Sequence, residues 1–239
     1  MVKLSYDFHI HSCLSPCGDN DMTPSNIVGM AYLNGLDVIA ITDHNSCRNC
    51  GVALETAKEY GITVLCGMEL TTEEEVHVVC LFPELKNALD FNEYVYDKLQ
   101  KIENEEAVFG EQRLVDCDDN ILEKEKYLLI NATNISFEEA FILAENFGGV
   151  AFPAHIDKSA SSLFSNLGFI PPNCNFNTVE IKNDNKFQSL CENNPYLKTC
   201  LTLKNSDAHY LTDISYAENY LMCNSKSPID IINAIKNIK

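Results

Sequence analysis

The sequence has few positively charged residues. Lysine and arginine together number 17 against 35 aspartates and glutamates, for a net charge of −18, and the arginines are Arg48 and Arg113 alone. A surface this acidic repels DNA, RNA and anionic membranes unless bound metal ions intervene. We therefore expect a small phosphorylated substrate rather than long nucleic acid, and no membrane partner.

Long apolar runs and a secretion signal are also missing. No run reaches the roughly 18–20 apolar residues that a membrane-spanning helix needs. The start MVKLSYDFHIH lacks the apolar core and cleavage site of a signal peptide, so we expect a cytoplasmic protein. The chain has 239 residues, of which 46% are hydrophobic and 22% charged, which predicts one folded domain over 1–239. The oligomeric state stays open.

Cysteine is abundant, but its pattern does not predict a disulfide framework. The eleven cysteines are an odd number at irregular spacings. Cys47 and Cys50 form one C-x-x-C motif without the second pair that a zinc knuckle needs. We expect reduced cysteines that act as small buried hydrophobes. Thiolate ligation by Cys13 or Cys17, which flank a loop after the first histidines, is the alternative.

Strand-like and helix-like segments alternate, which predicts a parallel α/β architecture. Thr23-Pro24 and Ser136 to Glu139 carry helix-start signals. Residues 87–106 resemble a long polar helix, and 107–131 hold two short strand-like runs around a polar turn. We interpret about 84–131 as an insertion that forms a lid over a pocket or a dimer contact. Strands are predicted at 4–10, 36–42, 62–66, 76–82, 150–153, 178–182, 199–204 and 218–223.

All six histidines lie at or just beyond a predicted strand. His9 and His11 close the first strand on one face, because residues i and i+2 of a strand point the same way. Asp7, one period earlier, is expected to orient one of these rings. In barrel enzymes the strand ends meet at the active site, so we expect the histidines and neighbouring acids to converge on metal ions. Taken alone, His77 is better explained as a core histidine and Asp43-His44 as a surface pair.

This series of H-x-H, D-H, E, H, H and D-x-H resembles the polymerase and histidinol phosphatase (PHP) superfamily over roughly 1–83 and 132–239. The resemblance implies a distorted TIM-like (β/α)7 barrel, here with a helical and hairpin insertion. Family members often carry Ser-Asp-Gly before a Thr-Pro helix start. Counting back from Thr23-Pro24 places that aspartate at Asp19, with Asp21 as the competing assignment. The implied metal ligands are His9, His11, Asp19, His44, Glu69, His77, His155, Asp207 and His209.

The resemblance also implies how two or three divalent ions are shared. Zinc, manganese and iron all suit such mixed oxygen and nitrogen ligands. No cysteine falls at an implied ligand position. One ion would be held by His9, His11, Glu69 and Asp207, a second by Glu69, His77 and His155, and a third by Asp19, His44 and His209.

The implied reaction is hydrolysis of phosphate esters by metal-activated water, in a small-molecule phosphatase or a short-nucleotide phosphodiesterase. Asp207 and His209 are candidates to move a proton. Arg48, Lys158 and Lys182 are candidates to bind phosphate, with solvated surface charge as the alternative. Two other functions compete: an exonuclease on DNA or RNA ends, which needs a basic track, and a non-catalytic metal-binding regulatory module.

Overall fold

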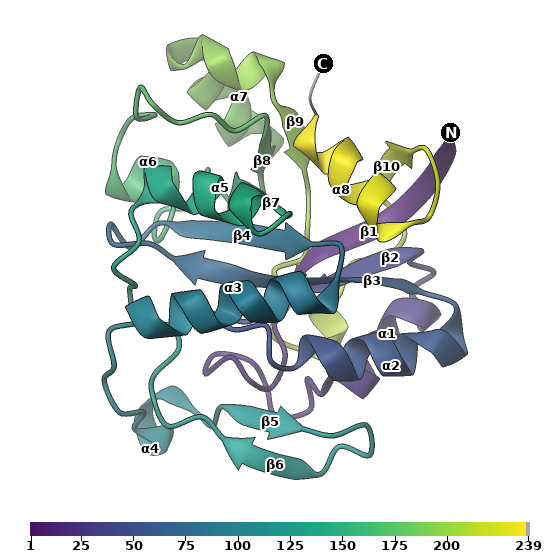
Figure 1. Ribbon diagram of the computed structural model, residues 1–239. Helices are drawn as coiled ribbons and strands as arrows, with labels where there is room; N and C mark the ends of the chain where they lie inside the picture. The colour runs from purple at the N-terminus through teal and green to yellow at the C-terminus, as the bar shows by residue number, and fades with distance from the viewer. Residues whose placement is uncertain (238–239) are drawn as a thin grey trace.

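The main sheet of the fold is curled and has six strands, in the order β10-β1-β2-β3-β4-β7 (Figure 1). The computed structural model describes residues 1–237, and the last two residues of the expected domain lie outside them. The strands are β1 (Val2–Ile10), β2 (Val38–Ile41), β3 (Thr63–Thr71), β4 (His77–Phe82), β5 (Arg113–Val115), β6 (Ile121–Lys124), β7 (Val150–Pro153), β8 (Thr178–Glu180), β9 (Leu201–Leu203) and β10 (Tyr220–Cys223).

The helices lie around this sheet. The helix starts predicted from sequence are confirmed: the Thr23 side chain caps α1, and Ser136 and Glu139 form a reciprocal capping box on α5. Across residues 1–237, no helix combines the length and hydrophobicity that a membrane crossing requires. The helices are α1 (Pro24–Leu33), α2 (Cys50–Tyr60), α3 (Leu85–Lys98), α4 (Glu106–Phe109), α5 (Phe137–Asn146), α6 (Leu163–Asn166), α7 (Asp184–Asn193) and α8 (Pro228–Lys236), with 3-10 turns at Pro195–Thr199 and Leu211–Asp213.

Strand directions differ from the expected all-parallel pattern, although the distorted α/β barrel is confirmed. β1, β2 and β3 are parallel, but β4 runs antiparallel to both β3 and β7, and β10 is antiparallel to β1. The link between β3 and β4 is only residues 72–76, too short for the crossover of a dozen or more residues that parallel strands require. As a result β4 begins at the edge where β3 ends, with His77 opposite Thr71.

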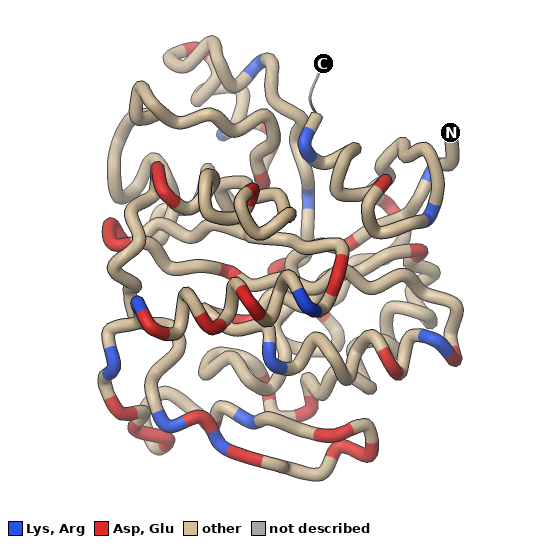
Figure 2. The backbone as a smooth tube through the Cα atoms, in the orientation of Figure 1, with Lys and Arg blue, Asp and Glu red and all other residues tan. Residues whose placement is uncertain are grey.

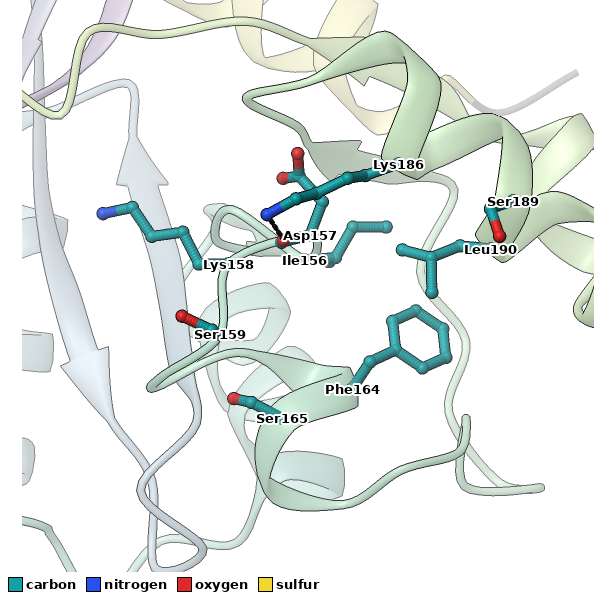
Figure 3. A pocket seen from close by; sticks show the side chains of 9 residues that line it. All are labelled: Ile156, Asp157, Lys158, Ser159, Phe164, Ser165, Lys186, Ser189 and Leu190. Carbon is teal, nitrogen blue, oxygen red and sulfur yellow. Dashed lines mark hydrogen bonds between the residues drawn. The ribbon is translucent and has the colours of Figure 1, made fainter.

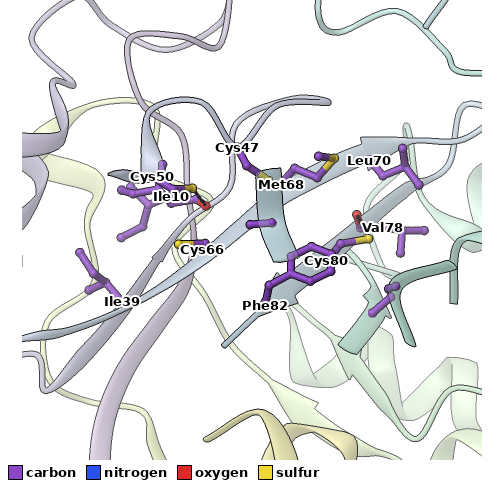
Figure 4. Close-up of a cluster of buried hydrophobic side chains, with 14 of the residues drawn as sticks. Ile10, Ile39, Cys47, Cys50, Cys66, Met68, Leu70, Val78, Cys80 and Phe82 are labelled. Atoms are coloured by element: carbon purple, nitrogen blue, oxygen red, sulfur yellow. Dashed lines mark hydrogen bonds between the residues drawn. The ribbon is translucent and has the colours of Figure 1, made fainter. Parts of the chain in front are cut away.

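Most cysteines are small core residues, as expected. Cys47, Cys50, Cys66 and Cys80 lie among aliphatic and aromatic side chains on one face of the sheet (Figure 4). Cys17 and Cys117, by contrast, are exposed. Burial against apolar neighbours is favourable for a thiol, which behaves as a small hydrophobe.

The segment between β4 and α5 has two parts. The helix predicted over 87–106 ends earlier, at Lys98, and its Phe91 is buried with its ring centroid 4.9 Å from that of Phe82. α3 therefore covers the sheet. The predicted hairpin is confirmed as β5 and β6, which lie apart from the main sheet (Figure 1). The Arg113 amide donates to the Cys13 carbonyl at 2.8 Å, which fixes the hairpin to the loop after β1.

Candidate metal centre

Glu69, near the end of β3, lies at the centre of a buried histidine cluster. Five imidazoles contact its carboxylate, and they come from segments as far apart in sequence as β1 and the end of β7. The convergence expected from sequence is thus present in the structure. The contacts of Glu69 Oε1 are with His77 Nδ1 at 2.8 Å, His155 Nε2 at 3.1 Å and His9 Nε2 at 3.3 Å; those of Oε2 are with His44 Nδ1 at 3.2 Å and His11 Nε2 at 3.3 Å.

Asp207, in the loop after β9, completes a first group of ligand atoms. Its Oδ1 lies 3.2 Å from His11 Nε2 and 3.4 Å from His9 Nε2. One ligand atom from each of His9, His11, Glu69 and Asp207 lies within 4.8 Å of the others. This grouping is the one that the family resemblance implied for the first ion.

Two further groups depart from the implied partition. His44 joins Glu69 and His77 in one, and His11 and His209 lie with Cys17 in the other. Asp19, the expected loop ligand, belongs to no such group within residues 1–237. Its side chain accepts the Asp21 amide at 2.9 Å and is half-buried. Metal binding by Asp19 or Asp21 stays a prediction.

Some buried ring nitrogens of the cluster make no hydrogen bond. Among the described side chains, His9 Nε2, His44 Nδ1 and His155 Nδ1 are buried and make no hydrogen bond. An unpaired polar atom in the interior costs free energy, and native structures leave few of them. Bound divalent cations would satisfy such lone pairs and neutralise the adjoining carboxylates. The donor set fits a polynuclear metal site.

Protonation states favour ligation as well. Burial lowers the pKa of His44 well below its usual value, which keeps the ring in its neutral, ligating form. Burial acts to raise the pKa of Glu69, but the electrostatic interactions with His77 and His9 outweigh it and lower that pKa well below its usual value. Glu69 is therefore an anion that can accept a cation.

Glu180, at the end of β8, is the site residue that sequence reasoning missed. It is fully buried, and its Oε2 lies 2.8 Å from His9 Nδ1, which directs His9 Nε2 at the cluster. The sequence signal was an acid flanked by apolar residues in a predicted strand. Asp7, expected to orient a ring, instead accepts the backbone amides of Ser206 and Ser215 at 3.0 Å each, so that expectation is wrong.

We expect Glu180→Gln to weaken metal binding 10- to 100-fold. Losing the carboxylate behind a ligating histidine typically costs about that factor, because the ring loses orientation and basicity. Competition with a chromophoric chelator measures the affinity. Glu192→Gln, on the exposed face of α7, is the matched control and should bind as the wild type does. Equal affinities for both variants would contradict this role of Glu180.

The loop after β1 contains serines whose hydrogen bonds hold the ring of His11 in place. Ser15 Oγ lies 3.0 Å from His11 Nδ1 and donates to Asp43 at 2.7 Å. Asp43 also accepts the amide and hydroxyl of Ser12, at 2.7 and 2.6 Å. The aspartate of the D-H motif therefore holds the loop that orients His11.

Unusual backbone geometry concentrates around the cluster. Asn45, His155, Ser161 and Asp207 all have positive φ, at 48°, 28°, 52° and 56°. Such conformations cost about 1–3 kcal/mol each and gather at functional sites, where surrounding structure maintains them. Two of the four residues are expected ligands, so this strain supports a functional role for the site.

The three candidate phosphate-binding cations differ in position. Lys158 lines the cluster's cavity and its Nζ pairs with Asp207. Lys182 Nζ donates to the carbonyls of Asn205 and Ser206 at 2.8 and 2.7 Å, which favours a role in holding the Asp207 loop. Arg48 does not line this cavity. Its guanidinium pairs with Glu123 and Glu125 of the β5–β6 region at 2.6 and 3.1 Å, contacts that favour a structural role. Substrate binding by these cations stays a prediction.

Comparison with known proteins identifies the family. The model of the PHP domain matches residues 7–164, which carry His9 through His155 of the cluster. The chain belongs to the PHP domain family. The resemblance inferred from the histidine and acid motifs is thereby confirmed.

Two curated relatives match part of the chain. A 5′-3′ exoribonuclease of Haemophilus influenzae is 29% identical over 119 residues, 48% of this chain and 39% of the relative. An uncharacterized protein of Methanocaldococcus jannaschii is 34% identical over 98 residues, 37% of this chain and 57% of the relative. The PHP chain thus spans about half the length of the curated relatives it matches.

Solved structures share the fold. The lesion-specific endonuclease Q of Pyrococcus furiosus aligns with a TM-score of 0.72 at 18% identity, covering 100% of this chain and 57% of that one. A protein of Bifidobacterium adolescentis assigned as a metal-dependent phosphoesterase aligns with a TM-score of 0.59 at 18% identity. The alignment covers 85% of this chain and 87% of that one. At such identities the likeness shows the fold alone.

Proposed function

We propose that this PHP protein hydrolyses small phosphate esters at a centre of two or three divalent ions, zinc, manganese or iron. The observation that carries the proposal is the convergence of six histidines, Glu69 and Asp207 in one cluster, in which His44, His77, His155 and His209 line a cavity of about 220 Å³. Divalent ions bound by such ligands lower the pKa of water and offset the negative charge of a phosphoryl group.

The protein's own groups position water and supply charge. Burial lowers the pKa of His209 to about 4, so its ring is neutral at pH 7. Burial acts to raise the pKa of Asp207, but His9 and His11 outweigh it and hold that pKa well below its usual range. Such lowered pKa values make both groups weak bases. The ionised Asp207 and the neutral His209 are therefore suited to accept a hydrogen bond from an attacking water and to orient it. Lys158 pairs with Asp207, and it would be free to bind a phosphate oxygen once Asp207 binds a metal ion.

A second pocket adjoins the cavity and suits the organic part of a substrate. Its volume is about 440 Å³, within the range of small-ligand sites, and Lys158 lines both spaces. Phe164 and Leu190 face each other across it, and Lys186 reaches over the carbonyl of Asp157 (Figure 3). An apolar wall with lysines at the rim fits an aromatic or aliphatic alcohol that carries phosphate, such as a short nucleotide.

Surface charge favours a short substrate. Figure 2 shows acidic positions along α3 and the β5–β6 hairpin, with basic positions scattered among them. A net charge of −18 opposes the close approach of a long polyanion. The named activity of the Haemophilus influenzae relative, a 5′-3′ exoribonuclease, supports the second candidate, removal of nucleotides from an RNA end.

Phosphate release from a substrate panel tests the proposal. Protein loaded with zinc, manganese or iron is incubated with phosphate monoesters, dinucleotides and long single-stranded RNA. We expect turnover of the small esters or dinucleotides and its loss in the His9→Ala/His11→Ala variant, folded as judged by circular dichroism. Preference for long RNA would support the exonuclease instead. If the metal-loaded protein hydrolyses none of these substrates, the proposed hydrolysis is contradicted, and a non-catalytic metal-binding module is the better interpretation of the cluster.

A further inference from the structure

The third group of ligand atoms contains a sulfur. One ligand atom each of His11, Cys17 and His209 lies within 4.8 Å of the others, and Cys17 lines the cavity together with Glu69 and His209. The rings of His11 and His209 are stacked with centroids 4.4 Å apart. Cys17 therefore occupies the region where the resemblance expects a loop carboxylate.

The surrounding backbone fixes Cys17 in this position. The Gly18 amide donates to the Ser15 carbonyl at 3.0 Å, and a Cβ at Gly18 would collide with the Ser12 carbonyl oxygen. The loop can therefore double back only with glycine after the cysteine. The next amide, of Asp19, donates to the His209 carbonyl at 2.9 Å, which ties the cysteine loop to the loop of the second histidine.

Both histidines present one nitrogen for a ligand. His209 Nδ1 lies 2.8 Å from the Asp207 carbonyl, so that contact orients the ring and leaves Nε2 available. His11 Nδ1 is similarly held by Ser15 at 3.0 Å. Independently, the buried His44 Nδ1 has no hydrogen-bond partner and belongs to a ring that lines the same cavity as Cys17. The cavity that Cys17 lines thus also contains a buried ring nitrogen that a cation could satisfy.

Asp19 is less well placed. It lies in none of the ligand groups found in the described part of the chain, and its Oδ1 accepts the Asp21 amide within its own turn.

We propose that Cys17 supplies a thiolate ligand to the ion held by His11 and His209. The inference rests on the metal centre of the proposed function and specifies one of its ligands. Thiolate with imidazole selects zinc or ferrous iron over magnesium and manganese, which prefer oxygen ligands.

Absorption of the cobalt-loaded full chain tests this ligand without reference to activity. A thiolate bound to Co²⁺ gives an intense near-ultraviolet charge-transfer band, whereas Co²⁺ with nitrogen and oxygen ligands shows weaker visible bands alone. We expect the intense band in the wild type, in Cys117→Ser, which removes the other exposed cysteine, and in Asp19→Asn. It should be absent from Cys17→Ser and Cys17→Asp, and Cys17→Ser should bind one Co²⁺ fewer.

The outcomes separate this inference from the proposed function. Visible cobalt bands without the charge-transfer band in the wild type would overturn sulfur ligation and leave the metal centre standing. A band that persists in Cys17→Ser, or is lost in Asp19→Asn alone, would also overturn it. Failure to bind cobalt at all would remove both proposals. Cys17 is exposed, so its variants should keep the wild-type melting temperature when no metal is bound.

Discussion

Replacing Glu69 by glutamine is expected to lower phosphoester hydrolysis about 1,000-fold. The substitution keeps the shape of the side chain but removes the charge that five imidazoles contact. A neutral amide offers one weak oxygen donor, so it cannot bridge two cations. Loss of several kcal/mol of metal-dependent charge stabilisation corresponds to a factor of about 1,000 at 1.36 kcal/mol per decade.

The measurement is turnover of the best substrate from the panel, together with the metal content of the purified variant. Glu73→Gln is the matched control, because Glu73 is exposed four residues further along the chain. We expect it to retain wild-type turnover and metal content. A Glu69→Gln variant that retained most of its activity would show that the reaction does not depend on this cluster.

The histidines that form the cluster could be identified from sequence because spacing and periodicity are local features of the chain. His9 and His11 share one strand face, and His44 follows a strongly apolar strand, so both features can be detected without tertiary information. Glu69 and Asp207 also follow predicted strands. All of these residues meet in the structure, so short local patterns indicated a cluster assembled from distant segments, and metal ligation by it stays a prediction.

Residues that support the ligands were harder to predict. Glu180 reaches His9 across 171 positions of sequence, and the packing of β8 beside β7 brings them together. Asp7 was predicted as an orienting group from its spacing, but backbone amides of the Ser206 and Ser215 segments occupy its carboxylate. Such contacts depend on how loops from other strands close over the site, which periodicity does not describe.

Strand direction was the other feature that alternation alone could not predict. Strands separated by helices suggested a parallel sheet, yet the short 72–76 link makes β4 antiparallel. That reversal has a functional consequence. His77 begins β4, so in a parallel strand it would lie at the opposite edge of the sheet, far from Glu69. The length of the 72–76 link was therefore the sequence signal that places His77 beside Glu69.

Chelation of bound metal is expected to lower the melting temperature by about 10 °C or more. A ligand present at about 1,000 times its Kd stabilises the native state by about 4 kcal/mol per site. For a chain of this size each kcal/mol shifts the melting temperature by about 2–4 °C. Calorimetry of wild-type protein with excess zinc or manganese, and then with EDTA, measures the shift. Glu69→Gln, already lacking its bridging ligand, should show a much smaller one.

The size of this shift should increase with pH. In the metal-free protein burial acts to lower the pKa of His9, but Glu180, Glu69 and Asp207 outweigh it and raise that pKa well above its usual 6.5. A proton on His9 therefore stabilises the metal-free fold below about pH 6.5, and this contribution is lost as the pH rises through the raised pKa. Metal binding itself strengthens as imidazoles lose protons. Both effects increase the difference in melting temperature between metal-loaded and metal-free protein from pH 6 to pH 8. A difference that decreased over this range would contradict protonation of His9 in the metal-free protein.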